Sequence, residues 1–120
     1  MRIAVASQGM DLTSKVDNRF GRAPYFLIYD TQSEKAQVVT NGQNVNAVQG
    51  AGIQAAENVT NMNVDLVVAG NFGPKAFRAL RAAGAKVALR ANGTVSEAIE
   101  LALNDELEIC EKANVKGHGW

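Results

Sequence analysis

The 120-residue sequence predicts a single α/β domain, with a five-stranded mixed sheet and helices on its faces. Three strand-like segments occupy the first third of the chain, and a short polar turn joins the second of them to the third. Helical and strand-like segments then alternate, and alternation of this kind produces parallel strands. The length suits one domain and not two. The sheet should therefore begin as an antiparallel meander and continue as a parallel unit.

The first half of the chain supplies three strands and one helix. Branched and aromatic residues dominate the segments 2–7, 24–30 and 35–41, and these residue types fit a pleated, half-buried surface. The polar sequence TQSE separates the last two segments, which we expect to form a hairpin. After a polar, glycine-bearing loop, apolar residues recur at helical spacing through 53–62, so a helix follows there.

The second half continues with two strands and two helices. Segment 64–70 is almost wholly apolar, as in a strand covered on both faces. A helix over 74–84 starts with proline and stops at glycine, the usual asymmetry of helix ends. A strand over 85–90 follows, and the last helix, over 94–105, opens on TVSE, which is a capping box.

We assign residues 1–107 to the domain and residues 108–120 to a polar C-terminal tail. The chain contains one cysteine, Cys110, and one histidine, His118. That pair excludes an intrachain disulfide, a cysteine cage for zinc or an iron–sulfur cluster, and a Ser–His catalytic pair in the domain. The apolar runs are too short to span a bilayer, and the first residues resemble a strand more than a signal peptide. We expect a cytoplasmic protein without a membrane partner.

Several catalytic and nucleic-acid functions find no support in the residues. The sequence GNFGPKAF lacks the spacing of a P-loop, and the chain has no GxGxxG motif. The acids at presumed strand ends do not form the carboxylate cluster of a two-metal nuclease, which argues against a ribonuclease H-type nuclease. Zero net charge and the lack of a basic–aromatic stripe disfavour nucleic acid as a partner. We therefore expect a binding protein and not an enzyme.

Charge and loop composition point to an anionic ligand. Five cations and no acid lie between Asp65 and Glu97, although the same charges suit an ordinary solvated surface. The loops after the first, fourth and fifth strands are rich in glycine or asparagine, and ligands of such sheets bind at these strand ends. GNFGPK and ANGT lead into helix N-termini, which favour anions. The alternative is that the glycines of GNFG only make a tight turn.

Two arginines stand three positions apart in RFGRAPYF, residues 19–26. A guanidinium group is a planar fork of five N–H donors, suited to an anion. Arg19 could instead be an ordinary surface residue, and Phe20 could instead pack in the core.

The sequence VDNRFGRAPYFLIYD resembles the signature of the dinitrogenase iron–molybdenum cofactor family, whose members carry or help to build metal–sulfur cofactors. The resemblance continues at VDLVVAGNFGPKAFRALRAAGAKV and at NGTVSEAIELALNDEL, in the family's order. It implies a ribonuclease H-like mixed sheet. Where many members have histidine, this chain has Arg19 and, around 44–50, NVNAVQG, so no side chain is assigned as a metal ligand.

Within the family the chain is most similar to the orange-protein branch, whose members hold a molybdenum–copper sulfide cluster without a covalent anchor. The resemblance thus implies noncovalent binding of such a cluster, with an iron–molybdenum cofactor precursor as an alternative cargo. Cofactor-assembly proteins or P-loop ATPases are the implied partners. A phosphoryl-ligand or nucleotide-binding regulatory domain using the same loops stays open.

A sulfide cluster brings its own ligands, so it needs N–H donors, cations and an apolar wall from the protein. The two arginines and the two glycine loops can supply the donors, and the phenylalanines are candidates for the wall. The expected cluster-binding residues are Arg19, Phe20, Gly21, Arg22, Gly70, Asn71, Phe72, Gly73 and Lys75.

Overall fold

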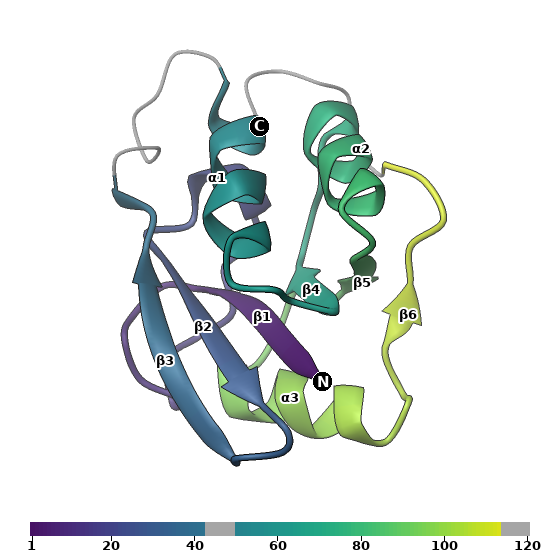
Figure 1. The fold of residues 1–120 in the computed structure, drawn as a ribbon. Coiled ribbons are helices and arrows are strands. Elements are labelled where there is room, and N and C mark those ends of the chain that lie inside the picture. Colours follow the sequence, from purple (N-terminus) through teal and green to yellow (C-terminus); the bar gives the residue numbers. More distant parts are fainter. Residues whose placement is uncertain (43–49, 114–120) are drawn as a thin grey trace.

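The computed structural model describes residues 1–42 and 50–113, and within them a six-stranded mixed sheet forms the centre of the molecule (Figure 1). The strand order is β3-β2-β1-β4-β5-β6. In chain order the elements are β1 (Arg2–Ser7), the 3₁₀ turn η1 (Phe20–Arg22), β2 (Tyr25–Asp30), β3 (Lys35–Thr40), α1 (Ala51–Thr60), β4 (Leu66–Ala69), α2 (Pro74–Ala82), β5 (Lys86–Leu89), α3 (Val95–Leu103) and β6 (Glu108–Ile109). β2 is antiparallel to β1 and β3, whereas β1, β4 and β5 are parallel. The predicted meander and parallel unit are confirmed.

The prediction of five strands is short by one, because β6 adds a sixth within the segment assigned to the tail. β6 pairs antiparallel with β5, and the Cys110 N–H donates to the Val87 carbonyl at 2.7 Å. Both residues of β6 are exposed, and a two-residue strand is too short to show the alternation that identifies strands. The end of the tail, residues 114–120 with His118, lies outside the described residues.

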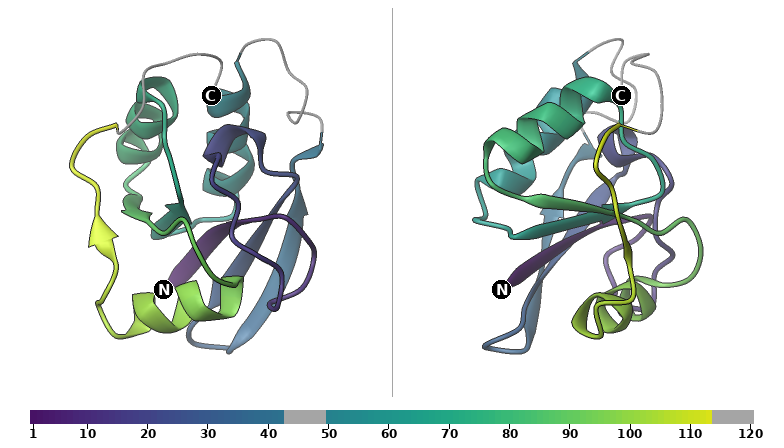
Figure 2. Two further views of the ribbon diagram at one scale, coloured as in Figure 1. Left: turned by 180° about the vertical axis from the view of Figure 1, so that it is seen from behind. Right: turned by 90° about the vertical axis from the view of Figure 1, so that its right-hand side faces the viewer.

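The helices cover both faces of the sheet. α1 and α2 lie on one face and α3 on the other (Figure 2). Along β1 the side chains alternate accordingly, since Ala4 and Ala6 pack under α1 and α2 while Ile3 and Val5 pack against α3. All four residues of β4 are buried, which confirms the expected central strand. None of the described helices is long and apolar enough to cross a bilayer.

The helix ends follow the sequence signals closely. α2 begins with Pro74 at its first position, and α3 begins with the predicted capping box. There the Glu97 N–H donates to Thr94 Oγ1 at 3.2 Å, and the Thr94 N–H donates to Glu97 Oε1 at 2.9 Å. α1 begins at Ala51, two residues before the predicted start, because the small residues Ala51 and Gly52 carry no periodic apolar signal although both are buried.

We expect the capping box to make part of the protein's stability sensitive to acid. The hydrogen bonds from the Thr94 N–H and hydroxyl lower the pKa of Glu97 below its ordinary value of 4.5. Because the folded-state pKa is the lower one, this stabilisation is complete above pH 4.5 and is lost as the pH falls through the folded-state pKa. Glu97→Ala should therefore reduce the loss of stability on acidification, measured by urea unfolding between neutral pH and pH ~3.

Two further variants control that measurement. Thr94→Ala should lower the free energy of unfolding at neutral pH by about 1 kcal/mol, the usual value of an N-cap side chain. Glu100→Ala, at an exposed position of the same helix, should leave the acid dependence unchanged. An equal change for Glu97→Ala and Glu100→Ala would contradict the assignment to the capping box.

Candidate anion-binding site

Two segments that are far apart in the sequence meet where β1 and β4 end. We call residues 17–22 the arginine loop and residues 70–73 the glycine loop. The Phe20 N–H donates to the Asn71 carbonyl at 3.2 Å, and Asn71 Nδ2 donates to the Asn18 carbonyl at 3.1 Å. The structure thus brings together the two loops to which the sequence assigned the cluster-binding residues.

Gly70 is required where the two loops cross. A Cβ at this position would lie 2.8 Å from Asn18 Oδ1 and 2.9 Å from Asn18 Cα. The Gly70 N–H also donates to the Asp17 carbonyl at 3.4 Å. The absence of a side chain at Gly70 therefore allows close approach of the arginine loop.

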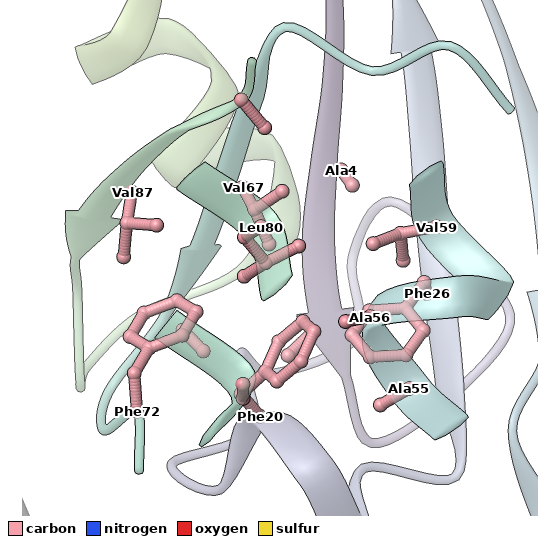
Figure 3. Packing of buried hydrophobic residues seen from close by; sticks show 14 of the residues in the cluster. Ala4, Phe20, Phe26, Ala55, Ala56, Val59, Val67, Phe72, Leu80 and Val87 are labelled. Carbon is pink, nitrogen blue, oxygen red and sulfur yellow. The ribbon is translucent and has the colours of Figure 1, made fainter. Parts of the chain in front are cut away.

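Phe20 and Phe72 are core residues, which agrees with the core-packing role considered for Phe20 and not with an apolar wall that faces the ligand. Both are 0% exposed, and their ring centroids are 5.1 Å apart with an interplanar angle of 27°. Phe20 also contacts the ring of Phe26 at 5.2 Å (Figure 3). Aromatic rings packed in this way contribute to stability beyond the area that they bury. The rings thus anchor both loops from beneath.

Asn41 fixes the turn that carries the arginines, a role that sequence analysis did not assign to it. It is fully buried, and its Nδ2 donates to the carbonyls of Ala23 at 2.8 Å and Gly21 at 3.3 Å. Its Oδ1 accepts from Asn58 Nδ2 of α1 at 2.7 Å. A buried amide with partners at both ends resists displacement. Gly21, itself buried, is therefore a structural part of the turn, with its carbonyl directed to Asn41.

The two arginines lie at either end of η1, where the Arg22 N–H donates to the Arg19 carbonyl at 3.3 Å. The Arg19 side chain is 47% exposed, and Arg22 is half-buried. Arg19 Nε lies 3.7 Å from Oδ1 of Asp17, which also accepts the Arg19 N–H at 2.8 Å. Asp17 is only 4% exposed. Sequence reasoning missed this carboxylate. An aspartate in a loop often accepts a hydrogen bond from the backbone N–H two residues further on, as Asp17 does from Arg19.

Two helix N-termini face the same end of the molecule as these loops. α1 packs against η1 and α2 packs against α1, and both helices begin at this end (Figure 1). Their N-cap residues, Gly50 and Gly73, have no capping side chain, and neither first turn contains an acid. Lys75, in the first turn of α2, is exposed. Gly73 has φ −78° and ψ 166°, an extended conformation open to any residue, so its backbone does not require glycine.

The loop after β5 is closed to a ligand, contrary to the expectation for ANGT. The Val95 N–H donates to the Ser14 carbonyl and the Ser96 N–H to the Leu12 carbonyl, both at 2.9 Å. With the capping box, these bonds occupy the first N–H groups of α3. Of the loops considered as candidates, the arginine loop and the starts of α1 and α2 therefore remain.

A hollow of about 620 Å³ lies at the opposite end of the sheet, where β4 and β5 begin. Its lining residues are Met1, Asp65, Leu66, Gly84, Lys86, Ala102, Asp105, Leu107 and Ile109. This lining mixes both charge signs with apolar side chains and includes no arginine. Among the described residues, His, Cys, Asp and Glu side chains form no group of three placed to hold a metal ion. The hollow and the arginine loop therefore lie at opposite ends of the sheet.

Comparison with known proteins gives the family. The model of the dinitrogenase iron–molybdenum cofactor family matches residues 1–105. The chain belongs to that family. The family is associated with molybdenum-containing cofactors. The prediction that the protein has a cofactor-related role is therefore confirmed.

Two solved structures share the fold, and one further protein is a relative by sequence. The apo form of the orange protein from Desulfovibrio gigas is 37% identical, with a TM-score of 0.91 over 95% of this chain and 96% of that one. A Thermotoga protein considered a NifB candidate is 41% identical, with a TM-score of 0.80 over 90% and 91%. An uncharacterized protein of Methanocaldococcus jannaschii is 27% identical over 82% of this chain and 90% of its own. The predicted fold and the resemblance to the orange protein are both confirmed.

Proposed function

We propose that this protein binds and carries a molybdenum–copper sulfide cluster noncovalently and without catalysis. The observation that carries the proposal is the arginine loop fastened to the glycine loop beside the start of α2, in a chain of this family. That arrangement sets two guanidinium groups and two helix N-termini, with Lys75, at one end of the molecule.

The residues present fit a compact polyanion. The sulfides of such a cluster are acceptors only, and guanidinium, ammonium and helix-terminal N–H groups are donors only. No thiolate is required, because the sulfides are already the metals' ligands. Arg19, Arg22 and Lys75 would hold the cluster by charge and hydrogen bonds, and the helix starts would add their positive ends.

Two other cargoes use the same chemistry. An iron–molybdenum cofactor precursor is also a polyanionic sulfide, and it differs in its metals. A phosphoryl ligand is favoured by one specific observation, the two uncapped helix N-termini without acids, which suit phosphate as well as sulfide. The proteins that assemble or receive the cluster would be its partners.

Reconstitution tests the proposal. The full chain is incubated anaerobically with tetrathiomolybdate, with and without copper, and desalted. We expect retained molybdenum and copper with visible absorption. Parallel incubations contain iron with tetrathiomolybdate, or phosphate or ATP alone. Retention only of an iron–molybdenum species would favour the precursor, and colourless protein that binds phosphate or ATP would favour a phosphoryl ligand. Failure to retain any sulfide species would overturn the proposal.

We expect Cys110→Ser to retain the metals in full. Cys110 is 7% exposed, and its Sγ donates to the Lys112 carbonyl at 2.6 Å, so the thiol is committed to the edge of the core. Metal content per protein after desalting is the measurement, with a thermal unfolding curve as the control for folding. Release of the metals by this variant would make the thiol a ligand and would contradict noncovalent binding.

A further inference from the structure

We propose that Asp17 is an internal competitor for the bound anion, which weakens its hold on Arg19 and makes binding reversible. This inference rests on the proposed function, because it concerns the affinity of that same site. It goes beyond that function by assigning release to a named side chain of the chain itself.

The carboxylate of Asp17 is held firmly in place. The Asp17 N–H donates to the Ala6 carbonyl at 2.8 Å, and the Asp17 carbonyl accepts from the Gly70 N–H at 3.4 Å. These bonds tie its backbone to β1 on one side and to the glycine loop on the other. With 4% exposure, the side chain lies beneath the arginine loop and not in solvent.

Arg19 can serve two anions in turn. Its side chain is about half exposed, and its Nε lies 3.7 Å from Asp17 Oδ1. Only one partner of this ion pair can move, since the carboxylate is fixed and the long arginine side chain can rotate outward. An arriving anion must draw the guanidinium away from Asp17, and a departing one returns it.

This arrangement suits a carrier better than a store. A site built only from cations and helix N-termini would hold a polyanion tightly and would release it slowly, because affinity differences lie mostly in the dissociation rate. A carboxylate that competes for Arg19 lowers that affinity. Asp17 also pairs with Arg19 when no anion is bound, and this ion pair stabilises the unloaded state.

Asp17→Asn separates charge from position. The Asn oxygen still accepts the Arg19 N–H that Asp17 Oδ1 accepts at 2.8 Å, so the turn is kept and the charge removed. The full chain is titrated with tetrathiomolybdate. Dissociation of the probe is timed after the loaded protein is mixed with an excess of a competing acceptor for tetrathiomolybdate. We expect about ten-fold tighter binding, mostly through slower dissociation. Asp11→Asn, which removes an exposed charge from the same long loop, is the matched control and should change the affinity little.

A double variant decides whether Asp17 acts through Arg19. In Arg19→Ala protein, the gain from Asp17→Asn should largely vanish, and a merely structural role would not produce that coupling. Urea unfolding of each variant confirms folding. If the parent binds the probe and Asp17→Asn binds it equally or more weakly, the inference fails alone. If neither protein retains the probe, the proposed function fails, and the inference fails with it.

Discussion

Arg19→Ala and Arg22→Ala should each weaken binding of a molybdenum–sulfide probe by about ten-fold or more. A charge-assisted hydrogen bond contributes roughly 1.5–3 kcal/mol, and each guanidinium supplies at least one such bond in the proposed site. Since each guanidinium binds the probe through its own bonds, the double variant should lose about a hundred-fold. Equilibrium titration with tetrathiomolybdate measures both effects.

Lys112→Ala and Lys35→Ala are the matched controls. Both lysines are exposed, one beyond β6 and one at the start of β3, so each removes a charge away from the loops. They should change the affinity by less than about two-fold at moderate salt, where exposed charges are screened. Equal losses in all four single variants would mean that diffuse charge attracts the probe, and the arginine loop would lose its special role.

The order of elements was predictable because the core pattern is local. The runs at 2–7, 24–30 and 64–70 are strands buried on at least one face, and their apolar residues lie next to one another in the chain. The start of α2 and the capping box of α3 are also set by neighbouring residues. By contrast, β6 depends on pairing with β5, which no pattern within its two residues can show.

The site was predictable in its segments and not in the roles of its residues. That the arginine and glycine loops meet follows from the ends of two parallel strands. What each residue does there depends on the crossing itself. Gly70 admits Asn18, and the Asn71 amide binds the Asn18 carbonyl in place of a ligand. Asn71→Asp would therefore lose a structural hydrogen bond as well as add charge.

Asp17 and Asn41 were missed for the same reason. Each forms its decisive contacts after folding, Asp17 beneath Arg19 and Asn41 between the turn and α1. The residue type of a polar residue in a loop does not indicate whether it is buried, since the same residue types occur at buried and exposed positions. The density of asparagine and aspartate around the loops was the available hint.

Phe20→Ala should lower the free energy of unfolding by about 3–5 kcal/mol, measured by urea denaturation. The ring is fully buried between Phe26 and Phe72, and the cavity left behind would lie at the junction of η1, α1 and the sheet. The net stability of a domain is about 5–15 kcal/mol, so this one change would remove a large part of it. Val38→Ala, on exposed β3, should cost far less.

Phe20→Leu separates anchoring from ligand contact. Leucine keeps most of the buried volume, so the variant should stay folded with a loss of roughly 1.5 kcal/mol. Because the Phe20 ring has no exposed surface, binding of tetrathiomolybdate by the folded variant should match that of the parent. A stable Phe20→Leu protein with lost binding would return the ring to the ligand wall. Unchanged binding means that Phe20 serves the site only by fastening the arginine loop to the core, so its contribution appears in stability.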